Sequence, residues 1–155
     1  MLIFNPETPR RGTIFAWHGF PDCPSSFEAF GRIASGRGWR VIAPFLPGYG
    51  GSEPLRRPTA KQLGTHMVQT AREWLEDEPA ILVGHDWGAI GAYEALKLDH
   101  PFSSATLVSV PPVPVYLRNL PSYPRQITLS RYILFFQLAG IAEKTVDREY
   151  LRRIY

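Results

Sequence analysis

Four short runs of mostly apolar, strand-forming residues recur along the chain and alternate with stretches of helical pattern. The runs are Thr13–Trp17, Arg40–Ala43, Ala80–Val83 and Ala105–Val110. Within each run the apolar residues are consecutive rather than alternating, which is typical of strands buried on both faces. Strands that alternate with helices in this way form parallel sheets with helices on both sides. The sequence therefore predicts an α/β fold built on a parallel sheet.

The segments between the runs carry helix signals. The segment 25–35 begins with Ser25 or Ser26 as a candidate cap and is closed by Gly36. The segment 88–98 predicts another helix. Between them, the segment 59–75 predicts an amphipathic helix, because its apolar residues recur at helical spacing: Leu63, Met67, Ala71, Trp74 and Leu75.

The composition changes at Pro111, where closely spaced prolines interrupt the alternation of strands and helices. The segment from Leu120 to Tyr155 is aromatic and helical in pattern, and apolar residues lie almost all round this helix. Such a helix must pack against other parts of a protein. We therefore expect residues 1–110 to form the N-terminal part of the core and residues 111–155 to begin a helical cap over an active site.

Composition and charge narrow the functional classes. The chain has 155 residues, 45% hydrophobic and 20% charged, with a formal net charge of +3. Its basic residues are dispersed, so nucleic-acid binding is not expected. The single cysteine, Cys23, excludes a disulfide framework and a multi-cysteine metal site, and no metal or cofactor is predicted. Neither a signal-peptide pattern nor a run of about 18 apolar residues is present, which predicts a cytoplasmic protein without a membrane span.

The sequence G-H-D-W-G-A at residues 84–89 lies between a predicted strand and a predicted helix. A nucleophile elbow is a sharp turn of this kind, and it needs small residues two positions before and two after the nucleophile. Gly84 and Gly88 meet that need, and the central residue is Asp86. We predict Asp86 as a carboxylate nucleophile, held ionised near a helix N-terminus. The alternative is that Asp86 only caps the helix.

A second motif, H-G-F-P at residues 18–21, directly follows the first predicted strand. An oxyanion hole in this architecture uses one backbone N–H from the residue after the nucleophile and one from the loop after an earlier strand. These residues are Trp87 and Phe20. Gly19 permits a tight backbone turn between the first predicted strand and Phe20.

Together, H-G-F-P and G-H-D-W-G-A resemble the epoxide hydrolase branch of the α/β-hydrolase fold family, to which haloalkane dehalogenases are closely related. The resemblance runs from Gly12 to about the end of the chain. It implies an Asp nucleophile that forms an alkyl-enzyme ester, and a ring-opening tyrosine before a Phe-Gln-x-x-Gly segment of the cap. Residues 136–140, F-Q-L-A-G, match that segment, and Tyr132 falls at the tyrosine position. His18 and Phe136 are predicted to contact the substrate; Tyr132 as a plain core aromatic is the alternative.

The sequence departs from this pattern in two places. Phe45 stands where many members carry Asp, a position that is usually structural. The histidine and acid of the family's triad lie beyond the cap, and this chain carries neither, so it resembles a truncated hydrolase that does not turn over. His66 and His100 are poorly placed to act as the base. The opening strands of the family fold are also expected to be absent.

Three hypotheses about function follow. The first is an epoxide-hydrolase-like enzyme acting on a small epoxide or similar electrophile. The second is haloalkane dehalogenation by the same Asp86, with the Trp87 indole bound to the leaving halide; Phe20, which has no side-chain donor, argues against it. The third is a non-catalytic fragment, or half of a site that another chain completes. An open sheet edge further predicts self-association.

Overall fold

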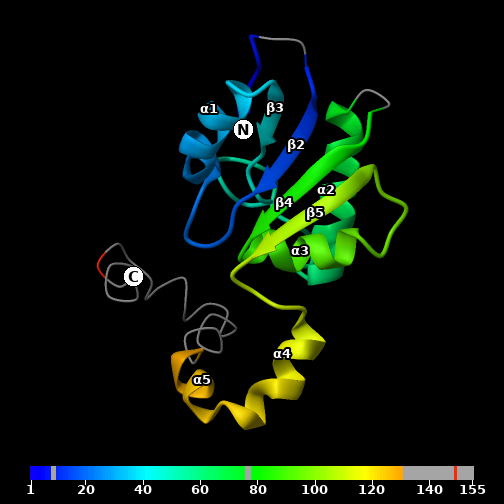
Figure 1. The fold of residues 1–155 in the computed structure, drawn as a ribbon. Coiled ribbons are helices and arrows are strands. Elements are labelled where there is room, and N and C mark those ends of the chain that lie inside the picture. The colour runs from blue at the N-terminus through cyan, green and yellow to red at the C-terminus, as the bar shows by residue number, and fades with distance from the viewer. Residues whose placement is uncertain (8–9, 76–77, 131–148, 150–155) are drawn as a thin grey trace. The chain divides into compact units, whose positions relative to one another are not determined.

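The computed structural model describes residues 1–7, 10–75, 78–130 and 149. The chain divides into two compact units, Met1–Pro112 and Val113–Tyr155. The first unit is an α/β sheet structure, and the described part of the second is helical (Figure 1). Each unit is described by itself below.

The first unit contains a five-stranded sheet in the order β1-β3-β2-β4-β5. The four strands β2 to β5 run parallel, and β1 pairs antiparallel with β3 at one edge. The predicted α/β fold with a mainly parallel sheet is thereby confirmed. The strands are β1 (Leu2–Phe4), β2 (Gly12–Trp17), β3 (Trp39–Ala43), β4 (Ala80–His85) and β5 (Phe102–Val108).

Two strands differ from their prediction for physical reasons. Strand β1 was not expected; its three residues are too few to show a hydrophobic period, and Ile3 remains exposed at the sheet edge. The expectation that the opening strands of the family fold are absent is therefore wrong for this one short strand. Strand β5 runs from Phe102 to Val108 rather than from Ala105 to Val110. The predicted strand started too late because Ser103 and Ser104 are polar and interrupt the apolar pattern.

Helices cover both faces of the sheet (Figure 1). Helix α1 (Glu28–Ser35) packs on one face, where its Ala34 joins Ile14, Ala16 and Val41 in a small core. Helices α2 (Ala60–Trp74) and α3 (Trp87–Ala95) cover the other face. They enclose the larger core, which includes these fully buried side chains: Phe15, Trp17, Ile42, Met67 and Leu82.

The helix starts were predicted with mixed success. Helix α2 begins one residue after Thr59, whose hydroxyl accepts a hydrogen bond from the Gln62 N–H at 3.2 Å, as an N-cap does. The predicted cap at Ser25 or Ser26 is wrong. Both serines lie inside a 3-10 helix, η1 (Pro24–Phe27), which starts after Cys23 because Pro24 suits the first helical position.

Strand β5 forms the second edge of the sheet within the described residues. Four of its seven residues in a row, 103–106, are exposed, and Val108 is 47% exposed. Unpaired backbone groups along such an edge are a template for another strand. Self-association through this edge stays a prediction.

The second unit contains α4 (Val113–Asn119), the 3-10 helix η2 (Leu120–Ser122) and α5 (Pro124–Leu129). Helical structure thus begins at Val113, earlier than the predicted Leu120, since Pro114 falls in the first turn, where a missing N–H costs nothing. The Tyr116 hydroxyl lies 2.8 Å from the Ser130 hydroxyl and donates a hydrogen bond to it.

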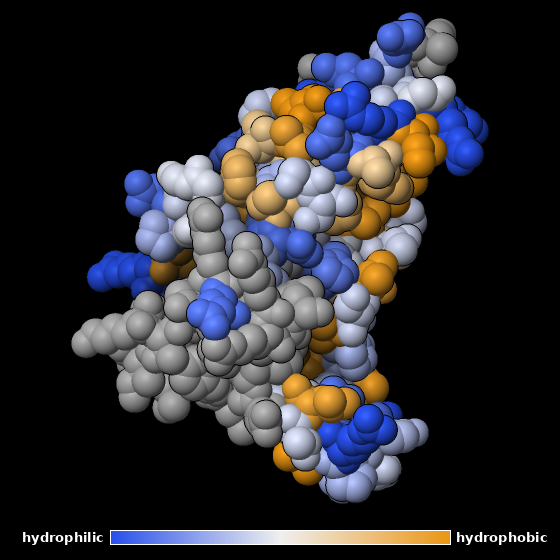
Figure 2. Space-filling model, turned by 90° about the vertical axis from the view of Figure 1, so that its left-hand side faces the viewer, coloured by the Kyte–Doolittle hydropathy of each residue, from blue (hydrophilic) through white to orange (hydrophobic). Residues whose placement is uncertain are grey.

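The surface carries no membrane-spanning element in the part of the chain that is described: no helix there is long and apolar enough to cross a bilayer. Figure 2 shows hydrophobic surface scattered among hydrophilic surface on one face of the first unit. Scattered exposed apolar side chains of this kind are ordinary for a folded protein.

Candidate active site

Asp86 occupies the turn between the end of β4 and the first residue of α3. Its backbone has φ 53° and ψ −115°, in the left-handed half of the conformational map that favours glycine. Flanking glycines make the turn possible. A Cβ on Gly84 would lie 2.7 Å from the Gly88 carbonyl oxygen, and one on Gly88 would lie 2.7 Å from the Trp17 carbonyl carbon. The turn therefore has the geometry of a nucleophile elbow.

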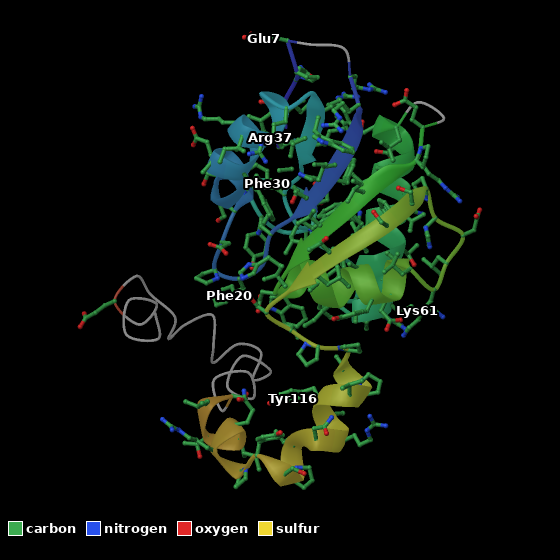
Figure 3. All side chains as sticks on the ribbon, viewed as in Figure 1. Glu7, Phe20, Phe30, Arg37, Lys61 and Tyr116 are labelled. Carbon is green, nitrogen blue, oxygen red and sulfur yellow. The ribbon has the colours of Figure 1, made fainter. Side chains whose placement is uncertain are left out.

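The loop after β2 packs directly against this carboxylate. The backbone N–H of Phe20 donates a hydrogen bond to Asp86 Oδ1 at 3.0 Å. A Cβ on Gly19 would lie 2.6 Å from the same oxygen, so any side chain at that position would push the loop away. Figure 3 shows Phe20 near the end of the sheet where β2 and β4 finish. Gly19 thus explains how a backbone donor reaches the half-buried carboxylate.

The helix-cap alternative for Asp86 finds no support in this geometry. Asp86 holds the N-cap position of α3, but its side chain makes no capping hydrogen bond to that helix. Its Oδ1 instead accepts the Phe20 N–H from a loop 66 residues away in sequence. Trp87, the other residue predicted for the oxyanion hole, is the first residue of α3, where backbone N–H groups have no partner inside the helix.

His18 lies beneath the loop rather than in an open site. The ring is fully buried, its Nδ1 lies 2.8 Å from the Gly19 carbonyl oxygen, and its Nε2 lies 3.0 Å from the Leu46 backbone nitrogen. The Leu46 N–H requires an acceptor, so Nε2 is unprotonated and Nδ1 carries the hydrogen that it donates to Gly19. With both nitrogens bonded to the backbone, neither is left for the substrate contact predicted for His18. The residue instead joins the loops after β2 and β3.

Acid is expected to weaken the fold through His18. Burial lowers the pKa of this imidazole below its ordinary 6.5, against smaller raising effects from Gly19 and Asp22. The unfolded chain therefore binds a proton more readily than the folded one. The contribution to stability is fully present above pH 6.5 and is lost as the pH falls from there through the folded pKa. Urea unfolding on either side of this pH measures the slope.

The control must account for His66, because burial lowers the pKa of that imidazole as well. We expect His18→Phe to be less stable by about 1–3 kcal/mol, because the Leu46 N–H loses its acceptor. In a His66→Gln background, His18→Phe should also flatten the dependence on pH. A slope unchanged by His18→Phe would contradict the assignment of a neutral, buried His18.

One pair at the site was not predicted. His85 Nδ1 and Asp22 Oδ2 lie 3.4 Å apart, and both side chains are about one third exposed. The pair joins the loop after β2 to the residue that precedes Asp86. Nothing in the sequence signals it, since the two residues are far apart in the chain and become neighbours only through the parallel pairing of β2 with β4.

Two predicted site residues, Tyr132 and Phe136, lie outside the described residues, so their roles stay predictions. Within the part of the chain that is described, no group of three or more His, Cys, Asp or Glu side chains is arranged to hold a metal ion.

Comparison with known proteins decides the family. The model of the alpha/beta hydrolase fold family matches residues 12–146. The chain belongs to this family. Its relatives place this chain in the epoxide hydrolase branch: it is 34% identical over 160 residues to "Epoxide hydrolase A" of Mycobacterium tuberculosis, covering 95% of this chain and 47% of that protein.

Two further proteins are similar to this chain. The "AB hydrolase superfamily protein YfhM" of Bacillus subtilis is 29% identical, with 86% of this chain and 48% of that protein covered. The crystal structure of Epoxide Hydrolase A from Mycobacterium thermoresistibile matches with a TM-score of 0.61 at 30% identity, covering 87% of this chain and 45% of that one. The chain spans about half the length of the curated relatives it matches.

Proposed function

We propose that the chain carries the nucleophile half of an epoxide-hydrolase-like site, with Asp86 as the residue that attacks the substrate. The observation that carries the proposal is the hydrogen bond from the Phe20 N–H to Asp86 Oδ1 at the elbow. It holds a carboxylate at the carboxyl end of a parallel sheet, where ligands bind in open α/β folds. The names of the relatives support the same chemistry.

The two carboxylate oxygens have different roles in this proposal. Oδ1 already accepts the Phe20 N–H, whereas no donor from the described residues is bonded to Oδ2. Oδ2 therefore attacks an epoxide carbon, the C–O bond of the ring breaks, and the ring oxygen takes a proton to become a hydroxyl group. Oδ1 becomes the ester carbonyl oxygen. It already accepts the Phe20 N–H, which would stabilise a negative charge that develops on this oxygen.

The proton donor to the ring oxygen is proposed to be Tyr132, and the second oxyanion donor is proposed to be the Trp87 N–H. Both assignments rest on the resemblance to epoxide hydrolases and on position in the sequence. The substrate is a small epoxide, because an alkyl-enzyme ester forms without a leaving group only when a strained ring opens. Haloalkane chemistry by the same carboxylate would instead release a halide ion.

Intact-mass spectrometry after incubation with styrene oxide tests the proposal. We expect one covalent adduct, equal in mass to the epoxide, on the peptide that contains Asp86, and no adduct on Asp86→Asn. The matched control is Asp99→Asn, which removes an exposed carboxylate from the segment between α3 and β5. An adduct that persists in Asp86→Asn, or halide release from a haloalkane with no reaction of the epoxide, would contradict the proposal.

A further inference from the structure

The loop after β2 contacts the elbow at two consecutive elbow residues. The Phe20 N–H donates a hydrogen bond to Asp86 Oδ1 at 3.0 Å, and two residues further along the loop Asp22 Oδ2 lies 3.4 Å from His85 Nδ1. His85 is the last residue of β4, and Asp86 precedes the first residue of α3. The Asp22–His85 pair therefore holds the loop beside the same turn that carries the proposed nucleophile.

The Asp22–His85 pair is too exposed to contribute much to the stability of the fold. Both side chains are about one third exposed. Water screens pairs of this kind, so their contribution to stability is generally small. A contact of this strength hardly changes whether the chain folds, but it can decide where a loop lies.

The backbone around Phe20 needs such a contact. Before Phe20, buried His18 is bonded to backbone atoms, but Gly19 then follows, and glycine has more conformational freedom than any other residue. After Phe20, Pro21 has its φ fixed by its ring, so the backbone between Phe20 and Asp22 is stiff. A displacement of Asp22 is therefore transmitted to the Phe20 N–H, whereas Gly19 does not resist it.

From this geometry we propose that Asp22 and His85 are positioning residues, whose contact keeps the Phe20 N–H on Asp86 Oδ1 and so leaves Oδ2 to attack the epoxide. The inference rests on the proposed function of Asp86. Neither positioning residue exchanges a proton with the substrate in this role. Without their contact the loop moves away, and the Asp86 carboxylate is free to rotate about its Cβ–Cγ bond.

Two opposite effects on the rate of alkylation follow from the loss of the Phe20 donor. The carboxylate becomes more nucleophilic, which raises the rate by a factor of about ten at most, since one neutral hydrogen bond has a modest net strength. Loss of orientation lowers the rate, and a misplacement of about 1 Å can cost about 10²-fold. The loss of orientation is the larger effect, so we expect a net fall of about tenfold.

The first arm of the experiment measures the rate at which styrene oxide alkylates the full chain, by intact mass. Asp22→Ala and His85→Ala, which remove the contact from its two sides, should each lower the rate about tenfold. Asp22→Asn keeps an oxygen that faces His85 Nδ1, so it should recover most of the rate. The matched control is Asp99→Ala, which breaks an exposed pair with Arg72 and should keep the parent rate. Urea unfolding should give similar stabilities for all these proteins.

The second arm reads the Phe20 amide directly, in ¹⁵N–¹H NMR spectra of the unreacted chain. An amide proton that loses a hydrogen bond to a carboxylate moves upfield. We expect the Phe20 resonance to move upfield in Asp22→Ala, in the same direction as in Asp86→Ala, which removes the acceptor itself. It should stay in place in Asp99→Ala. A role of Asp22 in stability alone would leave this resonance unmoved.

The outcomes separate the inference from the proposed function. Alkylation of Asp22→Ala and His85→Ala at the parent rate would overturn the inference. So would a slower rate with an unmoved Phe20 amide, or a rate that Asp22→Asn does not recover, because Asp22 would then act in another way. A parent chain that forms no adduct would overturn the role of Asp86 as nucleophile, while an upfield shift of the Phe20 amide in Asp22→Ala would still support the positioning contact.

Discussion

Incubated with excess styrene oxide, the 155-residue chain is expected to accumulate its Asp86 ester and to form no diol over many hours. Hydrolysis of the ester needs an activated water, and a general base typically contributes about 10²–10⁴ in rate. The measurement follows the fraction of alkylated chain by intact mass and the diol by chromatography. Epoxide consumption should stop at one equivalent per chain.

The reason lies in where the histidines are. The chain has four. His18 is buried and bonded to backbone through both nitrogens. His66 lies within α2 beside Thr70, and the His100 Nδ1 accepts a hydrogen bond from the Phe102 N–H at the start of β5, away from the elbow. His85 Nδ1 lies 3.4 Å from Asp22 Oδ2, and His85 is the one histidine next to Asp86 in the chain.

His85 also supplies the decisive control. Repeated turnover by the pure chain would contradict the expectation, and its loss in His85→Gln would then identify the Asp22–His85 pair as the base. If turnover persisted in His85→Gln, the base would have to come from another kind of side chain. If the ester accumulates equally in both proteins, the pair has only a structural role.

Gly88→Ala is expected to lower the free energy of unfolding by about 3 kcal/mol, at the upper end of the range for overpacking. The added methyl group would meet the carbonyl carbon of Trp17 at 2.7 Å and the carbonyl oxygen of His18 at 2.8 Å. Both are backbone atoms, which cannot rotate away as a flexible side chain does. Relief requires β2 and α3 to separate, which also displaces the Phe20 donor. Domains of this kind have only about 5–15 kcal/mol of stability, so the loss is large.

Urea unfolding followed by circular dichroism measures this change, with Gly36→Ala as the matched control. A Cβ on Gly36 would meet nothing closer than the Arg32 carbonyl oxygen at 3.5 Å, and its φ is an ordinary −61°. We expect the control to be unchanged or up to about 1 kcal/mol more stable, because alanine restricts the unfolded chain. Equal stability of Gly88→Ala and the parent would show that the elbow is not tightly packed.

Features of the fold and of the candidate site could be predicted from the sequence where the residues that form them are close together in the chain. The elbow was predictable, because Gly84, Asp86 and Gly88 are close in the chain and follow a buried strand. The alternation of apolar runs with helices likewise predicted the sheet. Strand β1 and the Asp22–His85 pair were not predictable, since each depends on a partner far away in sequence. The burial of His18 was missed for the same reason: the donor to its Nε2 comes from Leu46 in another loop.

The backbone of Asp86 places folding and chemistry in opposition. At φ 53° and ψ −115° the backbone of a residue with a side chain is strained, which in comparable cases costs about 1–3 kcal/mol of stability. Glycine would adopt the same conformation without this strain. A protein selected for robustness alone would therefore have glycine at position 86. The chain instead has a carboxylate at this position, and the strain lowers the stability of its fold. Efforts to make this protein more durable would meet that conflict first, since the substitution that most relaxes the turn, Asp86→Gly, is the one that removes the proposed nucleophile.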